Sequence, residues 1–221
     1  MEITATTMMD AWKRAVHAIA SHGHVSLDDE KRECRELLNL AVTVEQPATI
    51  GEAIRAMRST RKWIYPSEDE LANIMLNKES SPIYDYLYGQ RIFAYEGVLN
   101  QVDEHVIPSL QARPGSRRAF VSLLNPVEDL RSGASNTPGI ILISFRIIEK
   151  KLCVTALIRT SGFFTGWPAN VYQVARLQEY VARALSIVPG SVTTISLSAH
   201  LYADQYDDIA MVLGKDVLER K

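Results

Sequence analysis

The most informative part of the sequence is the segment Arg159-Thr160-Ser161-Gly162-Phe163-Phe164-Thr165-Gly166-Trp167-Pro168-Ala169-Asn170. It begins with a guanidinium and a hydroxyl, and it ends with a carboxamide after a proline that suits the first turn of a helix. Thirty residues after Asn170, the triplet His200-Leu201-Tyr202 adds an imidazole and a phenol. A cation, a bifunctional amide and an imidazole-phenol pair are groups that a nucleoside monophosphate could use.

Apolar runs around this segment predict the strands of one large sheet. Residues 119–124, 140–148 and 152–158 form three such runs, and Glu149-Lys150-Lys151 between the last two predicts a hairpin turn. Residues 37–44 predict a further buried strand. In the last predicted strand we expect one apolar face and one polar face. The apolar face would carry Ile195, Leu197, Ala199 and Leu201, and the polar face Ser196, Ser198, His200 and Tyr202.

The segments between these strands carry helix and turn signals. Apolar spacing predicts an opening helix over residues 5–20, closed by the polar stretch 21–32, and another helix over 168–185. Thr49 is expected to be the N-cap of a helix that runs to Met57, and Ser67 precedes a helix start with acidic residues. A long helix is predicted over 88–108, followed by a turn at Pro114-Gly115. The pattern predicts an α+β fold.

Composition narrows the class of protein. A chain of 221 residues with 47% hydrophobic content predicts one domain over residues 1–221. The net charge of -2 argues against a nucleic acid polymer as partner. The two cysteines lie far apart, which predicts neither a disulfide framework nor a metal site. Since no leader and no membrane-length apolar run is present, we expect an unprocessed cytoplasmic protein with no membrane partner.

Five motifs connect the sequence to a known family. In chain order they are Tyr88-Gly89-Gln90-Arg91, Ser116-Arg117-Arg118, Arg159-Thr160, Gly166-Trp167-Pro168-Ala169-Asn170 and His200-Leu201-Tyr202. This series resembles the thymidylate synthase superfamily, in particular its short, archaeal-type branch. Five ordered motifs are much more specific than any one of them, and the resemblance spans about residues 88–206.

The resemblance implies a thymidylate synthase-like fold, with a large mixed sheet packed by helices. It also implies a pyrimidine nucleoside 5′-monophosphate as ligand, methylenetetrahydrofolate as one-carbon donor, and a homodimer packed sheet to sheet. The near-continuous apolar strands favour dimerisation, because such strands need cover on both faces.

The resemblance also implies roles for the phosphate-binding residues. Arg159 would hold the 5′-phosphate of its own subunit, and Thr160 stands where the family has a serine hydroxyl. Arg117 and Arg118 would reach the phosphate of the neighbouring subunit. A planar guanidinium donates two parallel bonds to a phosphate, so these roles suit arginine. Taken alone, Arg117-Arg118 is also typical of a solvated turn.

The base and the sugar would be read by three further side chains. Asn170 matches the family residue that pairs with the O4 and N3-H edge of uracil, whereas relatives that act on cytosine often have Asp there, so the sequence favours uracil. The alternative for Asn170 is a helix cap. His200 and Tyr202 match the pair that binds the sugar 3′-hydroxyl, although an isolated histidine is more often structural.

The residues at the reacting end depart from the family. The family has a nucleophilic cysteine after a proline, about twenty residues before the phosphate arginine. Here Pro138 is followed by Gly139, which lies twenty residues before Arg159. Gly162 stands where the family usually has an aspartate that helps order the base pocket and the folate site. A thiolate adds readily at C6 of a pyrimidine and so activates C5, but glycine supplies no nucleophile.

Three other residues were possible sources of reactivity. Cys153 lies in an apolar strand and is expected to be buried and inert. Cys34 has charged neighbours but lies outside the resembling region. Glu36 faintly resembles the family's general-acid/base glutamate segment, although a glutamate before an apolar strand is commonly a solvated strand end. The catalytic residues therefore stay unassigned, with Glu36 as a candidate.

The sequence supports three functional hypotheses. The first is an enzyme that acts on a uridine or deoxyuridine monophosphate, in C5 one-carbon transfer or in a derived reaction without a cysteine nucleophile. The second is a nucleotide hydrolase or another nucleotide-modifying enzyme of a specialised biosynthetic pathway. The third is a non-catalytic nucleotide-binding homologue.

Overall fold

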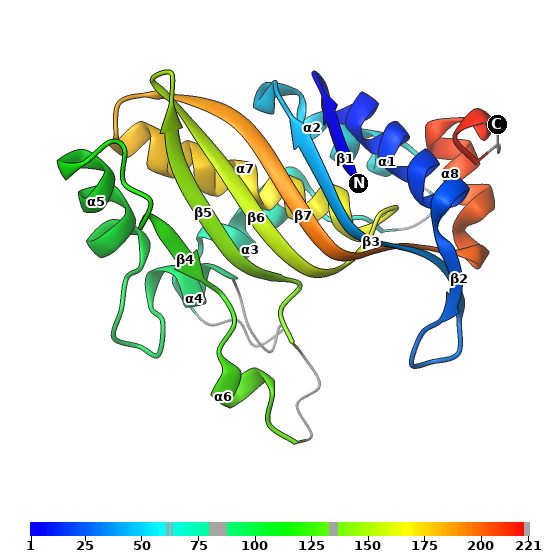
Figure 1. The fold of residues 1–221 in the computed structure, drawn as a ribbon, viewed down its shortest axis with the longest axis horizontal. Coiled ribbons are helices and arrows are strands. Elements are labelled where there is room, and N and C mark those ends of the chain that lie inside the picture. The colour runs from blue at the N-terminus through cyan, green and yellow to red at the C-terminus, as the bar shows by residue number, and fades with distance from the viewer. Residues whose placement is uncertain (61, 63, 80–87, 133–136, 219–221) are drawn as a thin grey trace.

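A seven-stranded mixed sheet dominates the computed structural model, which describes residues 1–60, 62, 64–79, 88–132 and 137–218 (Figure 1). The strand order is β1-β3-β7-β6-β5-β4, and β2 also pairs with β3. The β1–β3 and β6–β7 pairs are parallel, and the other pairs are antiparallel. The strands are β1 (Glu2–Ala5), β2 (His24–Leu27), β3 (Glu33–Val44), β4 (Phe120–Ser122), β5 (Ile140–Ile148), β6 (Lys151–Gly162) and β7 (Val188–Tyr202).

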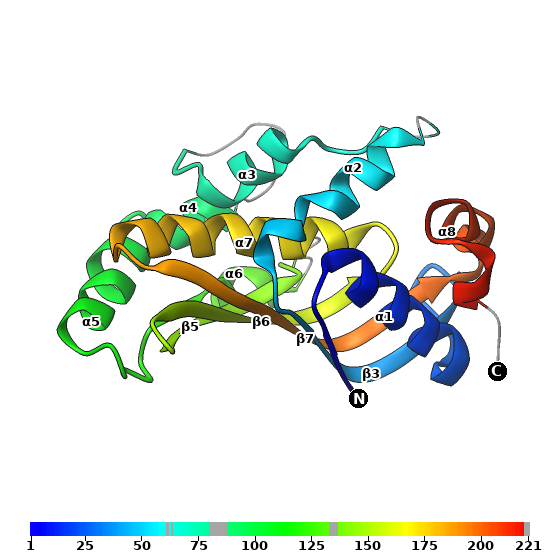
Figure 2. The same cartoon turned by 90° about the horizontal axis from the view of Figure 1, so that it is seen from above.

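Helices cover one face of this sheet. The α-helices are α1 (Met8–His22), α2 (Gly51–Ser59), α3 (Glu68–Leu76), α4 (Tyr88–Phe93), α5 (Ile107–Ala112), α6 (Pro126–Asp129), α7 (Gly166–Ala184) and α8 (Tyr206–Leu213). Figure 2 shows α1, α2, α3 and α7 above the sheet and no helix beneath it; we call this uncovered side the open face. None of the helices in the described ranges is long and apolar enough to cross a membrane. The α+β class with a large mixed sheet is confirmed.

Two tryptophans, one in α1 and one in α7, pack these helices against the end of β6. The Trp167 ring of α7 stacks on Phe163 with ring centroids 5.0 Å apart, and its Nε1 donates to Thr194 Oγ1 at 2.9 Å. Trp12 of α1 donates from Nε1 to the Phe163 carbonyl at 2.6 Å. All three aromatic side chains are fully buried. The segment that follows Arg159 is therefore held rigidly between the sheet and both helices.

Several local predictions are confirmed. Ile148 and Lys151 pair across a two-residue hairpin turn whose residues, Glu149 and Lys150, have left-handed φ angles of 49° and 63°. Ser67 caps α3 in a capping box with Glu70, and the turn at Pro114-Gly115 is present. Each of these features depends on a few adjacent residues, so the sequence carries it locally.

Two helix predictions were wrong in detail, and strands β1 and β2 were missed. Thr49 does not cap α2; it lies in a 3-10 turn, Pro47–Thr49, and its hydroxyl accepts a bond from the backbone N–H of Met8. The opening helix begins at Met8 and not at residue 5, because Glu2–Ala5 pairs as strand β1 with β3. The polar stretch after α1 contains strand β2, which pairs with β3.

The predicted long helix over residues 88–108 was also wrong. Helix α4 ends at Phe93, and a turn follows in which the Tyr95 N–H donates to the Leu99 carbonyl. Glu96 and Gly97 have φ angles of 52° and 71°, which a helix cannot contain. A short π-helix (Val102–Val106) then leads into α5. Apolar spacing across the turn imitated one continuous helix.

The predicted two faces of the last strand need correction. Thr194 and Ser196 are buried, and so are Ala199 and Leu201, so the buried parity changes near Leu197. On β3, Asn39 lies between the residues that pair with Ser196 and Ser198 and has a left-handed φ of 54°. The regular alternation is therefore interrupted at this level. Ser198, His200 and Tyr202 consequently point away from the side on which Ala199 and Leu201 are buried.

Candidate functional site

A cavity of about 370 Å³ lies where β3 begins and where β6 and β7 end, and the β2–β3 connection forms part of its wall. We call it the strand-end pocket. Its walls contain five of the candidate catalytic and binding residues: Glu36, Arg159, Thr160, His200 and Tyr202. The other lining residues are Ser26, Leu27, Asp28, Asp29, Glu30, Arg32, Cys34 and Ser198. Residues that are more than 160 positions apart in sequence thus share one cavity.

Strand register explains this convergence. Thr160 of β6 pairs with Ser198 of β7, and Cys34 of β3 pairs with Tyr202. His200 has Glu36 as its partner on β3 and Gly162 as its partner on β6. Because alternate residues of neighbouring strands point to the same face, these side chains meet on one wall.

The cationic side of the strand-end pocket contains two arginines. Arg159 is exposed, and its Nη2 lies 3.4 Å from the Thr137 carbonyl, to which it donates. The Arg32 guanidinium lies 4.0 Å from the centre of the Tyr202 ring, and its Nε donates to Asp28 at 2.9 Å. Arg32 was missed at the sequence level. Its only signal was a basic residue in the polar stretch before β3.

The imidazole and the phenol form a second group of ligands. The rings of His200 and Tyr202 contact each other edge to face, with centroids 4.9 Å apart. Burial lowers the pKa of His200 below its ordinary value, and the nearby Glu36 carboxylate opposes this shift. Burial raises the pKa of Tyr202, so its hydroxyl stays protonated. A neutral imidazole and a phenol can each donate and accept a hydrogen bond, as a sugar hydroxyl requires.

Asn170 and Gly139 lie together at the entrance to strand β5. A Cβ atom at position 139 would lie 4.0 Å from Asn170 Nδ2 and 3.4 Å from the Tyr88 hydroxyl. The Gly139 carbonyl accepts a bond from the Arg159 N–H at 2.8 Å, which connects this region to the phosphate arginine. Asn170 lies inside α7, which begins at Gly166, so the helix-cap alternative was wrong.

No thiol lies near Gly139 among the described residues. Cys34 is buried but lines the strand-end pocket, which its position outside the resembling region did not suggest. It lies on β3, three strands from β5, which corresponds to about 14 Å at ordinary strand spacing. Cys153 is partly exposed and not fully buried as expected, and it alternates with the buried residues Leu152 and Val154. Neither cysteine can replace a thiol at position 139.

Arg117 and Arg118 lie away from the strand-end pocket of their own chain. Both are exposed and immediately precede β4, the edge strand farthest from β3. The Arg118 carbonyl is within 2.9 Å of His105 Nε2. Neither side chain lines the strand-end pocket of its own chain.

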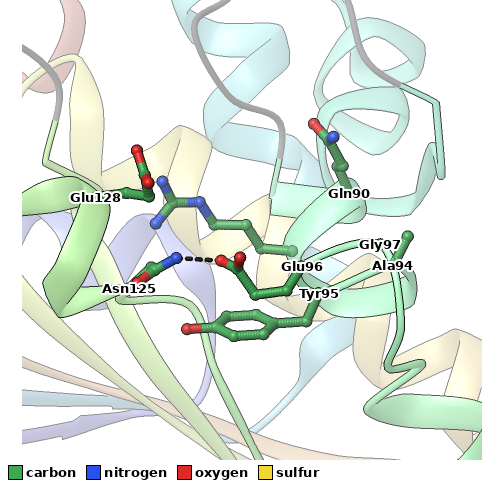
Figure 3. A pocket seen from close by; sticks show the side chains of 8 residues that line it. Gln90, Ala94, Tyr95, Glu96, Gly97, Asn125 and Glu128 are labelled. Atoms are coloured by element: carbon green, nitrogen blue, oxygen red, sulfur yellow. Dashed lines mark hydrogen bonds between the residues drawn. The ribbon is translucent and has the colours of Figure 1, made fainter.

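A second cavity, of about 320 Å³, lies between α4 and α6. Figure 3 shows Asn125 and Glu96 pointing toward each other across it, joined by a hydrogen bond. Arg91 lines this cavity, but its guanidinium donates to both carboxylate oxygens of Asp129 at 2.5 and 2.6 Å. Arg91 is the only cation among the described residues that line this cavity, and Asp129 already engages it, so the cavity suits an anion poorly. We therefore assign the candidate nucleotide site to the strand-end pocket.

Comparison with known proteins identifies the family of this chain. A sequence profile described as "Thymidylate synthase" matches residues 55–220. The chain is 34% identical over 211 residues to a protein of Methanosarcina barkeri named "Putative thymidylate synthase", covering 96% of this chain and 94% of the relative. A relative of the same name from Methanothermobacter thermautotrophicus is 29% identical over 220 residues, covering 96% of this chain and 97% of the relative. The extent of these matches, together with the sheet and the helices that cover it, means that the chain belongs to the thymidylate synthase family.

Proposed function

We propose that this protein binds a pyrimidine nucleoside 5′-monophosphate in the strand-end pocket. The observation that carries the proposal is that a guanidinium, a hydroxyl, an imidazole and a phenol line one cavity of about 370 Å³. That volume lies within the range of about 300–1,000 Å³ typical of small-molecule sites. The four groups have the chemistry that a phosphate and a sugar require, and they belong to the motifs by which the chain resembles its family.

In this proposal each part of the nucleotide has its own residues. Arg159, Arg32 and Thr160 hold the 5′-phosphate. His200 and Tyr202 hold the sugar hydroxyl. Asn170 lies beside position 139 at the start of β5 and does not line the strand-end pocket itself. In the proposal it reads the base and favours uracil over cytosine, because a carboxamide can accept from N3-H and donate to O4.

We also propose that two copies of this single-domain chain pair through the open face. A row of apolar side chains crosses that face in register, because Ala41 pairs with Ile195, Ile195 with Leu157, and Leu157 with Leu142. All four are only partly buried, and none packs against the core. A second sheet would cover them and would bring Arg117 and Arg118 of one copy toward the phosphate site of the other.

Ile195→Glu should convert the dimer to a monomer. A charge in the middle of the apolar row would be desolvated without a partner if the dimer formed. Light scattering coupled to size-exclusion chromatography measures the mass directly, and Met211→Glu, at an exposed residue of α8, is the matched control. A wild-type protein that elutes as a monomer at micromolar concentration would rule out the sheet-to-sheet dimer.

The chemistry in this proposal does not use a thiol. Gly139 has no side chain to add at C6, and Cys34 lies three strands away, which is about 14 Å across the sheet before any displacement along the strands. Gly162 adds no carboxylate beside the base. The residues described therefore do not fit folate-dependent transfer that begins with thiol addition, and any turnover follows a derived route.

Gly139→Cys should allow exchange of the hydrogen at C5 of a bound uracil nucleotide. A new Cβ would make only ordinary contacts, at 3.4 Å or more, so the substitution should be tolerated. The thiolate can then add at C6 and make C5 nucleophilic. Tritium release from C5-labelled dUMP measures this exchange, with Gly139→Ala as control. Release by the wild-type protein, with or without folate, would refute a thiol-free site.

Isothermal titration calorimetry against UMP, dUMP, CMP and dCMP tests the proposed function itself. We expect uracil nucleotides to bind more tightly than cytosine nucleotides, and mass spectrometry of the same mixtures reports any product. Tight binding with no product would favour the non-catalytic homologue. The absence of a thiol at Gly139 and of a carboxylate at Gly162 argues for this hypothesis. Absence of binding to all four nucleotides would refute the proposal.

A further inference from the structure

A row of side chains crosses four strands at the level of His200. His24 of β2 pairs with Glu36 of β3, Glu36 pairs with His200 of β7, and His200 pairs with Gly162 of β6. Side chains opposite each other on neighbouring strands have Cβ atoms about 4.5–5.5 Å apart. Glu36 therefore lies directly between two imidazoles, and the row ends at a residue without a side chain.

Glu36 is held in this position from both neighbouring strands. Its Oε2 lies 3.1 Å from His24 Nε2, and its Oε1 accepts a short hydrogen bond from the Ser198 hydroxyl. The side chain is 24% exposed, so it is largely withdrawn from solvent although it lines the strand-end pocket. Two partners on different strands fix the carboxylate more firmly than a solvated strand end would require.

We propose that Glu36 is a positioning residue, which keeps a negative charge beside His200 and so orients and polarises the imidazole that contacts the nucleotide sugar. This inference rests on the proposed function, since the ligand of His200 is the nucleotide. Position 162 supplies no such charge from the opposite side, although a Cβ there would lie only 3.5 Å from His200 Nε2. The carboxylate beside the His200 imidazole is therefore that of Glu36 on β3.

The other charged groups near His200 do not replace Glu36. Asp28 and Arg32, on the β2–β3 connection, act in opposite directions and are bonded to each other. Arg159 lies in the pocket wall and is a cation, as is Arg32. Burial lowers the pKa of His200, and Glu36 is the strongest group that raises it. Removal of the Glu36 charge should therefore lower this pKa further.

Glu36→Gln should move the titration of His200 to lower pH, because the carboxylate that raises its pKa is lost. NMR of the imidazole C–H signals follows each of the five histidines, and loss of one signal in His200→Asn assigns it. The pH dependence of nucleotide affinity should move in the same direction. Glu33→Gln, at an exposed residue of the same strand, is the control and should change neither measurement.

Gly162→Asp provides a second and opposite test. It would add a carboxylate on the β6 side of His200, where a Cβ makes only ordinary contact. The substitution should raise the titration midpoint of His200 in the wild-type background and restore this midpoint in the Glu36→Gln background. Unchanged midpoints in both single variants would overturn the role of Glu36, even if nucleotide binding is intact. A wild-type protein that binds no pyrimidine monophosphate would instead overturn the proposed function.

Discussion

Arg159→Ala should weaken binding of UMP or dUMP roughly 100-fold, which corresponds to about 3 kcal/mol of binding free energy. The reason is that Arg159 is the cation placed at the end of β6 beside Thr160, and its N–H anchors it to Gly139. Without the guanidinium, the phosphate dianion would lose two parallel hydrogen bonds, and Thr160 would bind the phosphate without its neighbour. Isothermal titration calorimetry at fixed ionic strength measures the change.

Two variants sharpen this experiment. Arg159→Lys keeps the charge but loses the planar fork, so its affinity should fall between those of the wild type and of Arg159→Ala. Arg183→Ala removes an exposed cation near the end of α7 and should leave affinity unchanged. Equal affinities for wild type and Arg159→Ala would show that the phosphate does not lie at this arginine.

Asp129→Ala should lower the free energy of unfolding by about 3–5 kcal/mol. The Asp129 side chain is 3% exposed and accepts two bonds from Arg91, whose side chain is 16% exposed. It also accepts a bond from the Asn125 N–H at 2.7 Å. Without the carboxylate, a largely buried guanidinium loses its partner and α4 loses its attachment to α6. Urea denaturation followed by circular dichroism measures the loss.

The same carboxylate should make stability depend on pH. Burial alone would raise the pKa of Asp129, but bonds from Arg91 and the Asn125 N–H outweigh it and lower this pKa. The stabilisation is therefore fully present above the unfolded value of about 4 and is lost as pH falls toward the lower folded value. Asp129→Asn should flatten this acid limb of the stability curve. An unchanged acid limb would mean that other carboxylates dominate acid unfolding.

The parts of the fold that the sequence predicted well are those with local causes. The hairpin at Glu149-Lys150 lies between two apolar runs, and Ser67 with Glu70 forms a capping box within four residues. Resemblance to the family motifs singled out Arg159, Thr160, His200 and Tyr202, and these four residues line one cavity.

Features that depend on distant partners could not be predicted. Strand β1 is only four residues long and exists because β3 offers it an edge. The change of buried parity near Leu197 goes with a left-handed Asn39 on another strand, so the periodicity of β7 alone gave the wrong face for Ser196. Arg32 reaches the strand-end pocket from the β2–β3 connection, and Cys34 reaches it by pairing with Tyr202 on β7.

Position 139 participates in the architecture through its main chain alone. Its carbonyl receives the Arg159 N–H, and a methyl group added there would meet nothing closer than 3.4 Å. A small side chain at this position is therefore compatible with the fold. A single codon change at position 139 could therefore remove or restore a nucleophile while the fold and the nucleotide-binding residues stayed the same.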